Sequence, residues 1–475
     1  MRAPGYYERH FICRNLEGYY TNFNIISRYN HRLTPELLSN VLHSLIDKEP
    51  ILALNFFRKD GSTRDDDHYA NGHNFVVRPV AKIDFADVVS FETVDRFDES
   101  TFKYINPLTC PVNIELPLWR MIVFDSKEDG YQYVCIYFEH ALFDGGSGAQ
   151  FHQDIAATLD EIDSSNDAMV ERLFTSRESI SIPEACEYTT NLFEPSLLTK
   201  LSFLSEKYNI LPNWTSYNYW TKSNSPQVFK TTVPTTKDLA TDYLLFNLNP
   251  TDLETIRKFC QREKIAITSY LEILGTFVFT ETFLQTMPND EKGSNGVWST
   301  STLIAVSGRR HVPSESFQYG TLVTGDIYTL PPIALDSTPS QLISLMKGFH
   351  NKLHKSVQNK TCFEKIGLYD YMNLWDFYKN KLNKTERHTL SVSNLGLIKT
   401  FGKWQILDMW FGSNTGVAYN FIFNVTSTPC NGLNIVMSYR PEFGEVRDPA
   451  TNELMIDVFK RKLDQQLVAF AKYKI

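Results

Sequence analysis

The sequence predicts a mixed α/β (α+β) protein made of two sandwich domains. The chain has 475 residues, more than one hydrophobic core usually organises, so two domains are expected. Strand-like and helix-like segments are mixed in both halves, without the regular alternation of a doubly wound nucleotide-binding fold. Residues 209–240 are rich in Pro, Ser, Thr and Asn, which favours a linker between an N-terminal domain at 1–208 and a C-terminal domain at 241–475.

The N-terminal half is expected to contain a helix followed by strands. Thr34 and Pro35 form a typical helix start, and apolar residues then recur along one face until Pro50. Strands are predicted at 51–57, 74–83, 118–124 and 131–138, and a second helix at 149–162. The charged turn between the last two strands favours a hairpin.

The C-terminal half shows the same mixture of elements. A strand at 242–248 is followed by a capped helix and by a strongly apolar helix that ends near residue 284. Further strands are predicted near 299–307, 390–393, 404–411, 417–426 and 433–439, and helices at 340–357 and 453–473.

Charge and targeting signals argue against several classes of protein. The net charge of −8 is unsuited to a nucleic-acid-binding protein that works by bulk charge. No apolar signal segment opens the sequence, and the seven cysteines are scattered without a Cys-x-x-Cys pair, as is typical of reduced thiols. We therefore expect a cytoplasmic monomer, with peripheral contact at the endoplasmic reticulum or a lipid droplet left open.

The strongest chemical signal is His140-Ala-Leu-Phe-Asp144-Gly145, which directly follows a strand that is expected to be buried. A neutral imidazole is the side chain best matched to take a proton at physiological pH. Asp144 in a tight turn can fix the local backbone, and Gly145, Gly146 and Gly148 are predicted to supply the unusual φ angles of that turn. A satisfied core histidine beside an ordinary Asp-Gly turn is equally consistent with this spacing.

Two other histidine patterns are predicted to be surface features. His43 and Asp47 repeat the His-x-x-x-Asp spacing, but they share the outward face of the first helix. His350 and His354 share a helical face as zinc ligands do, yet neither the accompanying Glu nor a third ligand is evident. Phosphate-binding and dinucleotide-binding glycine motifs are also absent from the sequence, so no metal and no bound cofactor is expected.

Several segments resemble, in order along the chain, the HxxxD acyltransferase superfamily. Pro117-Leu-Trp-Arg120, a hairpin, and then the segment from His140 to Gly148 are similar to its core. The superfamily includes chloramphenicol acetyltransferase, plant BAHD acyltransferases and peptide-synthetase condensation domains. Further segments resemble the start of the yeast alcohol acetyltransferases and two pieces of the second domain: 8–20, 305–310 with Tyr319-Gly320, and 391–396. The plant Asp-Phe-Gly-Trp-Gly loop is absent, which favours the fungal branch.

The resemblance implies two chloramphenicol-acetyltransferase-like domains with the active site in a channel between them. It implies that His140 is a general base for an acceptor that attacks acetyl-CoA directly. Asp144 is then structural, and Gly145 belongs to its turn. The partner of Asp144 is left open among three arginines: Arg120, Arg309 and Arg310.

The resemblance also implies roles for polar residues of the second domain. Ser391, Ser393 or Asn394 is expected to donate a hydrogen bond to the tetrahedral oxyanion. Arg309 and Arg310 are expected to bind the CoA phosphates, with structural ion pairing as an equal alternative.

The function expected from these residues is acetyl-CoA-dependent O-acetylation of small or medium apolar alcohols, with acetyl-CoA as co-substrate. One alternative is N-acetylation of a lipid-like or sphingoid-type amine, as in detoxification. Another is a non-catalytic binding protein that retains the fold.

Overall fold

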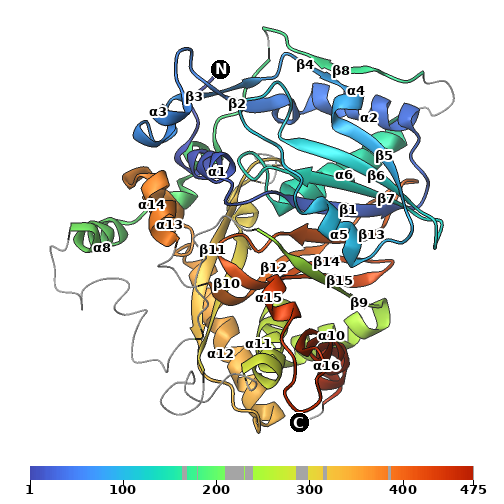
Figure 1. Cartoon of the computed structure of the whole chain (residues 1–475), viewed down its shortest axis with the longest axis vertical. Coiled ribbons are helices and arrows are strands. Elements are labelled where there is room, and N and C mark those ends of the chain that lie inside the picture. The colour runs from blue at the N-terminus through green and yellow to red at the C-terminus, as the bar shows by residue number, and fades with distance from the viewer. Residues whose placement is uncertain are drawn as a thin grey trace.

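The computed structural model describes residues 1–162, 168–178, 180–208, 229, 239–284, 298–313, 318–382 and 387–473. These residues form two large sheets, one in the upper half of the view in Figure 1 and one in the lower half. Helices pack against both sheets, so the mixed α/β class predicted from the sequence is confirmed. The predicted linker at 209–240 lies almost entirely outside the described residues.

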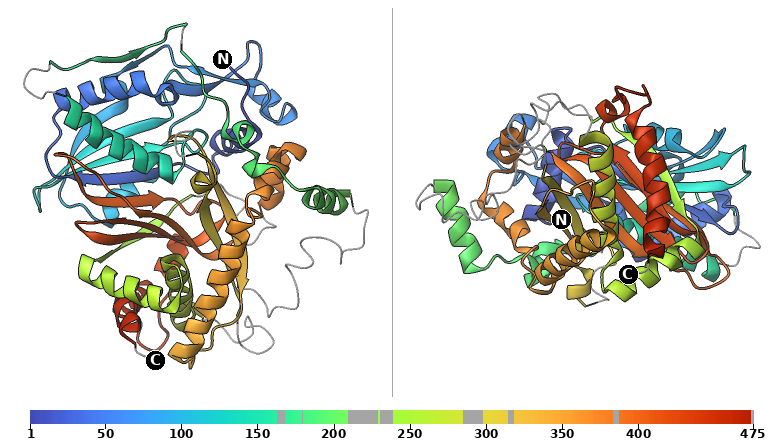
Figure 2. Two further views of the ribbon diagram at one scale, coloured as in Figure 1. Left: turned by 180° about the vertical axis from the view of Figure 1, so that it is seen from behind. Right: turned by 90° about the horizontal axis from the view of Figure 1, so that it is seen from below.

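The sheet of the N-terminal half has the strand order β13-β1-β7-β6-β5. The predicted hairpin is present as the antiparallel pair β6–β7. Helices α2 (Pro35–Lys48) and α6 (Gly145–Glu161) cover one face of this sheet (Figure 2, left). The strands are β1 (Phe23–Tyr29), β5 (Val89–Val94), β6 (Trp119–Ser126), β7 (Gln132–Phe138) and β13 (Ile406–Ser413).

The sheet of the C-terminal half has the order β11-β10-β12-β14-β15-β9, with helices on the face away from the N-terminal half (Figure 1). Its strands are β9 (Asp242–Leu248), β10 (Thr300–Ser307), β11 (Val323–Leu330), β12 (His388–Leu397), β14 (Tyr419–Thr428) and β15 (Gly432–Tyr439). Its helices are α10 (Pro250–Glu263), α11 (Ile267–Phe279), α12 (Pro339–Gln358) and α16 (Met455–Ala469).

Smaller elements connect and cover these sheets. The helices are α1 (Tyr6–Leu16), α3 (Arg64–Tyr69), α4 (Phe85–Val88), α5 (Glu99–Ile105), α7 (Cys186–Thr189), α8 (Leu197–Tyr208), α13 (Glu364–Gly367), α14 (Leu374–Lys381) and α15 (Pro441–Gly444). The pairs β2–β3 and β4–β8 are formed by β2 (Leu54–Arg58), β3 (Phe75–Pro79), β4 (Lys82–Asp84) and β8 (Arg172–Thr175).

Strand β13 joins the two halves. It comes from the C-terminal half of the chain but pairs antiparallel with β1 and so completes the N-terminal sheet. It also contacts the other sheet, because the Thr426 hydroxyl of β14 donates to the Met409 carbonyl of β13 (2.6 Å). The largest hydrophobic core accordingly contains residues of both halves. The division predicted at 209–240 therefore does not separate two independent sheets, since the pattern of a strand does not show which neighbour it pairs with.

Two predicted strands differ from the structure for reasons that involve proline. The segment 51–57 begins as a 3₁₀ turn, Pro50–Ala53, and becomes extended only in β2. The segment 74–83 is divided into β3 and β4, and β3 ends at Pro79, which has no N–H to donate to a strand ladder.

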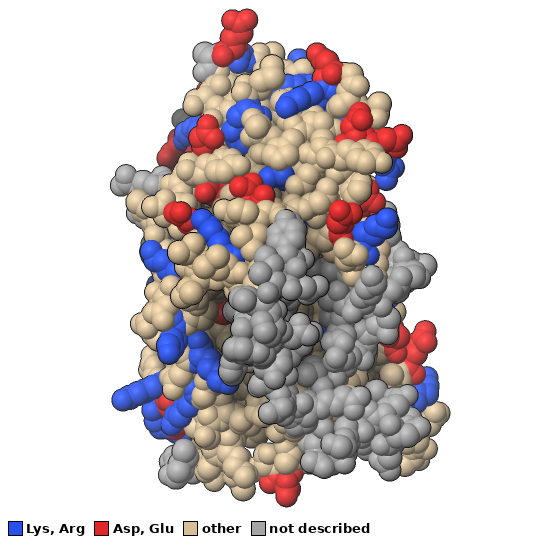
Figure 3. Space-filling view, turned by 90° about the vertical axis from the view of Figure 1, so that its left-hand side faces the viewer, with Lys and Arg blue, Asp and Glu red and all other residues tan. Residues whose placement is uncertain are grey.

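The surface carries charges of both signs. On the described part of the face shown in Figure 3, acidic and basic side chains are interspersed rather than gathered into a single field. Within the described residues, every helix is too short or too polar to cross a membrane.

Candidate active site

His140 directly follows β7, in the middle of the N-terminal sheet. Glu139 extends the strand pairing, because its N–H donates to the Leu118 carbonyl (2.9 Å). The hydroxyl of Thr321, which belongs to the C-terminal half, donates to the His140 carbonyl (2.8 Å). The backbone of the histidine is thus held from both halves, at the place where they meet.

Three aromatic rings surround the imidazole of His140. Phe11 of α1 stacks on it with 5.0 Å between ring centres, Phe23 of β1 lies at 4.6 Å, and Tyr20 lies at 5.7 Å. The Nδ1 atom is buried without a hydrogen-bond partner in the described structure, although the residue as a whole is partly exposed. Of the two ring nitrogens, Nδ1 is therefore the enclosed one.

These surroundings keep His140 neutral. Burial lowers the pKa of the imidazole to about 3, the Arg14 charge acts in the same direction, and the Asp144 charge opposes it. At physiological pH the side chain is therefore an unprotonated base, which is the form that accepts a proton.

Asp144 is the N-cap of α6 and is 2% exposed. Its Oδ1 accepts the N–H of Ser147 (2.9 Å), and its Oδ2 accepts both the Leu322 N–H (3.0 Å) and Nη1 of Arg309 (2.7 Å). Burial by itself raises the pKa of the Asp144 carboxyl, but the Arg309 charge and these hydrogen bonds lower it overall. These partners of the carboxylate all belong to the protein itself, so Asp144 fixes the backbone that follows His140.

Arg309 is the partner of Asp144. Its Nη2 also donates to the Ser147 hydroxyl (3.0 Å) and the Gly320 carbonyl (3.2 Å). Arg120 instead donates to the backbone carbonyls of Pro117 and Trp119, and Arg310 is exposed. Because the Arg309 guanidinium is engaged inside the protein, the geometry favours its structural role, and the predicted contact with CoA phosphates now depends on Arg310.

The glycines after the aspartate are helical, so the prediction of a turn with unusual φ angles is wrong. Helix α6 begins at Gly145, and Gly145, Gly146 and Gly148 all have negative φ. Close packing explains them instead. A Cβ on Gly146 would lie 2.5 Å from Nη1 of Arg309, and one on Gly148 would lie 2.7 Å from Cγ1 of Ile25. The small residues let α6 approach β1 and the Asp144 ion pair.

Two of the predicted oxyanion donors are occupied by structural contacts. The Asn394 side chain points to α11, where Nδ2 donates to the Thr268 hydroxyl (3.3 Å). The Ser391 hydroxyl donates to the Leu303 carbonyl of the neighbouring strand. Neither group is directed at His140.

Ser393 is the remaining predicted donor. Strand alternation places it on the face of β12 opposite Asn394, away from α11. On that side Leu395 packs against Gly145, since a Cβ there would lie 2.7 Å from its Cδ2. Ser393 is partly exposed, and its hydroxyl makes no hydrogen bond to another described residue. It is the predicted donor best placed to meet a ligand.

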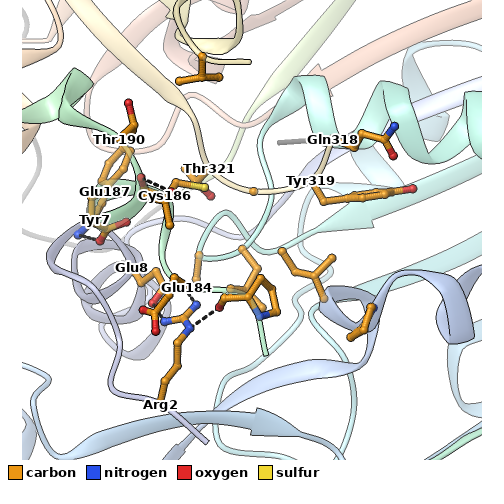
Figure 4. Close-up of a pocket in the computed structure, with 18 of the residues that line it drawn as sticks. Arg2, Tyr7, Glu8, Glu184, Cys186, Glu187, Thr190, Gln318, Tyr319 and Thr321 are labelled. Atoms are coloured by element: carbon orange, nitrogen blue, oxygen red, sulfur yellow. Dashed lines mark hydrogen bonds and ion pairs between the residues drawn. The ribbon is translucent and has the colours of Figure 1, made fainter. Parts of the chain in front are cut away.

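A cavity of about 710 Å³ lies between the first residues of the chain and the His140 motif (Figure 4). The motif contributes Ala141 and Leu142 to its wall. The rest of the wall comes from five described segments: 2–8, 49–51, 181–190, 311–313 and 318–321. The cavity therefore lies between segments of both halves. Its wall includes the two residues that follow His140 in the chain.

The cavity wall is rich in carboxylates. Glu8 pairs with Arg2 (2.6 Å), whereas the buried Glu187 accepts the N–H of Tyr7 (2.7 Å), as Figure 4 shows. Burial and then the charge of Glu8 raise the pKa of Glu187 to about 7. Glu49 and Glu184 add further carboxylates, so the lining is poorly suited to phosphate groups.

A model of the alcohol acetyltransferase family matches residues 3–463, nearly the whole chain. The chain belongs to the alcohol acetyltransferase family. An uncharacterised protein of Schizosaccharomyces pombe is 22% identical over 477 residues, covering 96% of this chain and 95% of that protein. Membership of this family supports acyl transfer as the chemistry of the chain.

Solved structures with low sequence identity share the fold. The trichothecene 15-O-acetyltransferase of Fusarium sporotrichioides superposes with a TM-score of 0.61 at 11% identity, covering 99% of this chain and 94% of that one. The first condensation domain of the CDA synthetase superposes with 0.57 at 13% identity, covering 99% and 96%. The acetyltransferase-family chain thus has the two-lobed fold that the resemblance implied.

The other histidine patterns lie outside this site. His43 and Asp47 are exposed on α2, as predicted. The His43 ring contacts a backbone carbonyl, and Asp47 pairs with Arg177. His350 and His354 stack on α12 with 5.6 Å between ring centres. Among the described residues, no group of three or more His, Cys, Asp or Glu is placed to hold a metal ion.

Helix α1 contributes to the site, and sequence periodicity missed it. The residues from Tyr6 to Cys13 are all buried, so the helix lacks the polar face that an amphipathic pattern requires. The charged residues in this segment, which are buried in the structure, were the feature of the sequence that could have indicated a role in the site. Arg14 lies in its last turn, and Asn15 donates to the buried Glu139 (2.6 Å) beside His140.

Proposed function

We propose that this chain is an acetyl-CoA-dependent alcohol O-acetyltransferase that forms acetate esters from small or medium apolar alcohols. The observation that carries the proposal is the state of His140: a neutral imidazole, fixed where the two halves meet, with Nδ1 enclosed. With Nδ1 enclosed, Nε2 is the ring nitrogen proposed to meet the substrate.

In the proposed reaction, Nε2 of His140 removes the hydroxyl proton while the alcohol oxygen attacks the thioester carbon. A tetrahedral intermediate forms, and its C–S bond then breaks. The proton on His140 passes to the departing CoA thiolate, so the products are an acetate ester and CoA. Ser393 is the proposed donor to the intermediate's oxyanion. No acyl-enzyme forms, in keeping with the absence of a Gly-x-Ser-x-Gly motif from the sequence.

The surroundings of His140 favour an apolar acceptor. Phe11, Phe23 and Tyr20 present ring faces and edges to the imidazole, and such a wall binds hydrocarbon chains rather than charged groups. We propose acetyl-CoA as co-substrate, with a monomeric, cytoplasmic protein that contacts a membrane or lipid droplet peripherally.

A second candidate function is N-acetylation of a lipid-like amine. The carboxylates of the adjoining cavity favour it, because Glu49 and Glu184 attract a cationic headgroup and repel an anionic one. The chemistry at His140 is unchanged in this alternative.

Release of free CoA from acetyl-CoA by the purified protein tests both candidates, with isoamyl alcohol, longer alcohols and a sphingoid amine as acceptors. Alcohol-dependent release that is lost in His140→Ala supports the O-acetyltransferase. Release only with the amine moves the function to N-acetylation. No release from folded protein leaves a binding protein on the same fold.

A further inference from the structure

Arg14 lies beside His140 without being part of the predicted site. It occupies the last turn of α1, and its Cζ lies over the Tyr20 ring at 4.2 Å and over the Phe11 ring at 5.2 Å from the ring centres. Both rings also pack against the His140 imidazole. The guanidinium and the imidazole are therefore held by the same two rings.

The donors of Arg14 are not used inside the described structure. Its guanidinium makes no hydrogen bond and no ion pair with a described residue, and the side chain is half-buried. The arginines nearby differ, because Arg9 pairs with Asp370 and Arg309 pairs with Asp144. The two aromatic faces compensate part of the charge of Arg14. A half-buried guanidinium whose nitrogens are neither paired nor fully enclosed can still donate to a ligand.

The one carboxylate close to Arg14 does not satisfy it. Glu139 is 1% exposed, and its carboxylate accepts Nδ2 of Asn15 (2.6 Å). Burial raises the pKa of Glu139 to about 7, so at neutral pH this side chain carries only part of a charge. The Arg14 charge therefore acts on His140, since it lowers the pKa of the imidazole more than Asp144 raises it.

The proposed reaction supplies one negative charge at this place. The alcohol and the thioester group are neutral, and the phosphates of CoA lie at the far end of the pantetheine arm. Negative charge appears on the former carbonyl oxygen only when the tetrahedral intermediate forms. A cation that meets charge only at that stage lowers the barrier without binding the substrates more tightly.

We propose that the Arg14 guanidinium donates hydrogen bonds to the oxyanion of the tetrahedral intermediate formed at His140. This inference rests on the proposed acyl transfer and makes Arg14 a catalytic residue. The aromatic rings hold the guanidinium in place before the charge develops, so little reorganisation is needed during the reaction.

Steady-state kinetics of Arg14→Met, Arg14→Lys and the control Arg28→Met test the proposal. Arg28 has the same kind of contact, with its Cζ 4.4 Å from the Tyr131 ring centre, but lies on the part of β1 remote from His140. We expect kcat to fall about 10²–10³-fold in Arg14→Met, less in Arg14→Lys and hardly in Arg28→Met, with similar KM values throughout. A raised KM with unchanged kcat would overturn the proposal.

The pH profile separates this role from an effect through His140. If Arg14 only lowers the pKa of the imidazole, the pKa of His140 rises in Arg14→Met. The pH below which the rate falls then moves towards neutral, and the rate at pH 8 equals that of wild type. The oxyanion role requires the rate to stay low at every pH. Recovery at pH 8 would therefore refute it.

Binding of butane-1-sulfonate, a tetrahedral anion on an apolar chain, gives a readout without turnover. Calorimetric titration should show binding to wild type and to Arg28→Met, and about tenfold weaker binding to Arg14→Met, equal to the loss of one charge-assisted contact. Equal affinity for all three proteins counts against the anion site. A wild type that is inactive with every acceptor would defeat the proposed function, while this titration still decides on Arg14. Circular dichroism melting of each variant verifies that it is folded.

Discussion

Replacement of Arg309 by Met tests the structural role of the ion pair with Asp144. The carboxylate is 2% exposed and loses its 2.7 Å partner, which leaves a buried charge without its counter-charge. Such a loss typically costs 3–5 kcal/mol. The hydrogen bonds from Ser147 and Leu322 remain, so we expect the lower end, about 3 kcal/mol.

Urea unfolding followed by fluorescence measures this loss, with Arg309→Lys as the matched control. Lysine keeps the charge but loses the second nitrogen that reaches Ser147 and Gly320, so about 1 kcal/mol is expected. The folded pKa of Asp144 is lowered, so the pair stabilises the protein above the unfolded carboxyl pKa and loses its effect as the pH falls through the folded pKa. The difference between wild type and Arg309→Met should therefore shrink in acid. Equal stability of all three proteins at pH 7 would refute the assignment of Arg309.

Three further substitutions test the packing, electrostatics and donor assignment of the site. Gly148→Ala should lower the free energy of unfolding by about 1–3 kcal/mol, since its Cβ would lie 2.7 Å from Ile25 and 3.1 Å from Phe138; an unchanged urea midpoint contradicts the close-packing explanation. The pKa of His140 is about 3 in the folded protein and 6.5 in the unfolded chain, so below pH 6.5 the unfolded chain takes up a proton that the folded protein does not. Wild type therefore loses stability as the pH falls, and His140→Gln should lose less. Between pH 6.5 and 5 the difference should be about 2 kcal/mol, and parallel stability curves would show that the imidazole is not desolvated. Ser393→Ala should lower kcat about tenfold or more while Asn394→Ala leaves it within about threefold; the reverse order would transfer the donor role to Asn394.

Much of the fold followed from local pattern. The cap at Thr34 and the apolar stripe after it place α2 within one residue of its observed start, since the Thr34 hydroxyl accepts the Leu37 N–H as such caps do. The hairpin β6–β7 and the strand β9 were likewise predicted from short-range patterns. Helix α1 was missed because burial on all sides removes the periodicity that reveals a helix.

The candidate site depended on a mixture of sequence and context. The spacing of His140 and Asp144 identified the motif, but the same spacing at His43 and Asp47 lies on the exposed face of α2. Only the fold distinguishes the two, by placing the first pair at the end of a central strand under aromatic rings. The glycines of the motif were correctly singled out for the wrong reason: they allow close approach rather than positive φ.

The sequence alone determined the class of fold, the HxxxD motif and the family resemblance. The first two depend on residue types at short spacings, and the resemblance depends on the order of such segments along the chain. The tertiary structure decided which arginine pairs with Asp144, which side Asn394 faces, and that Arg14 shares its aromatic neighbours with His140. It also decided that β13 completes the sheet of the other half. Each of these contacts joins residues more than a hundred positions apart, or sets the direction of a side chain, and both are fixed by the packing of distant segments rather than by local pattern.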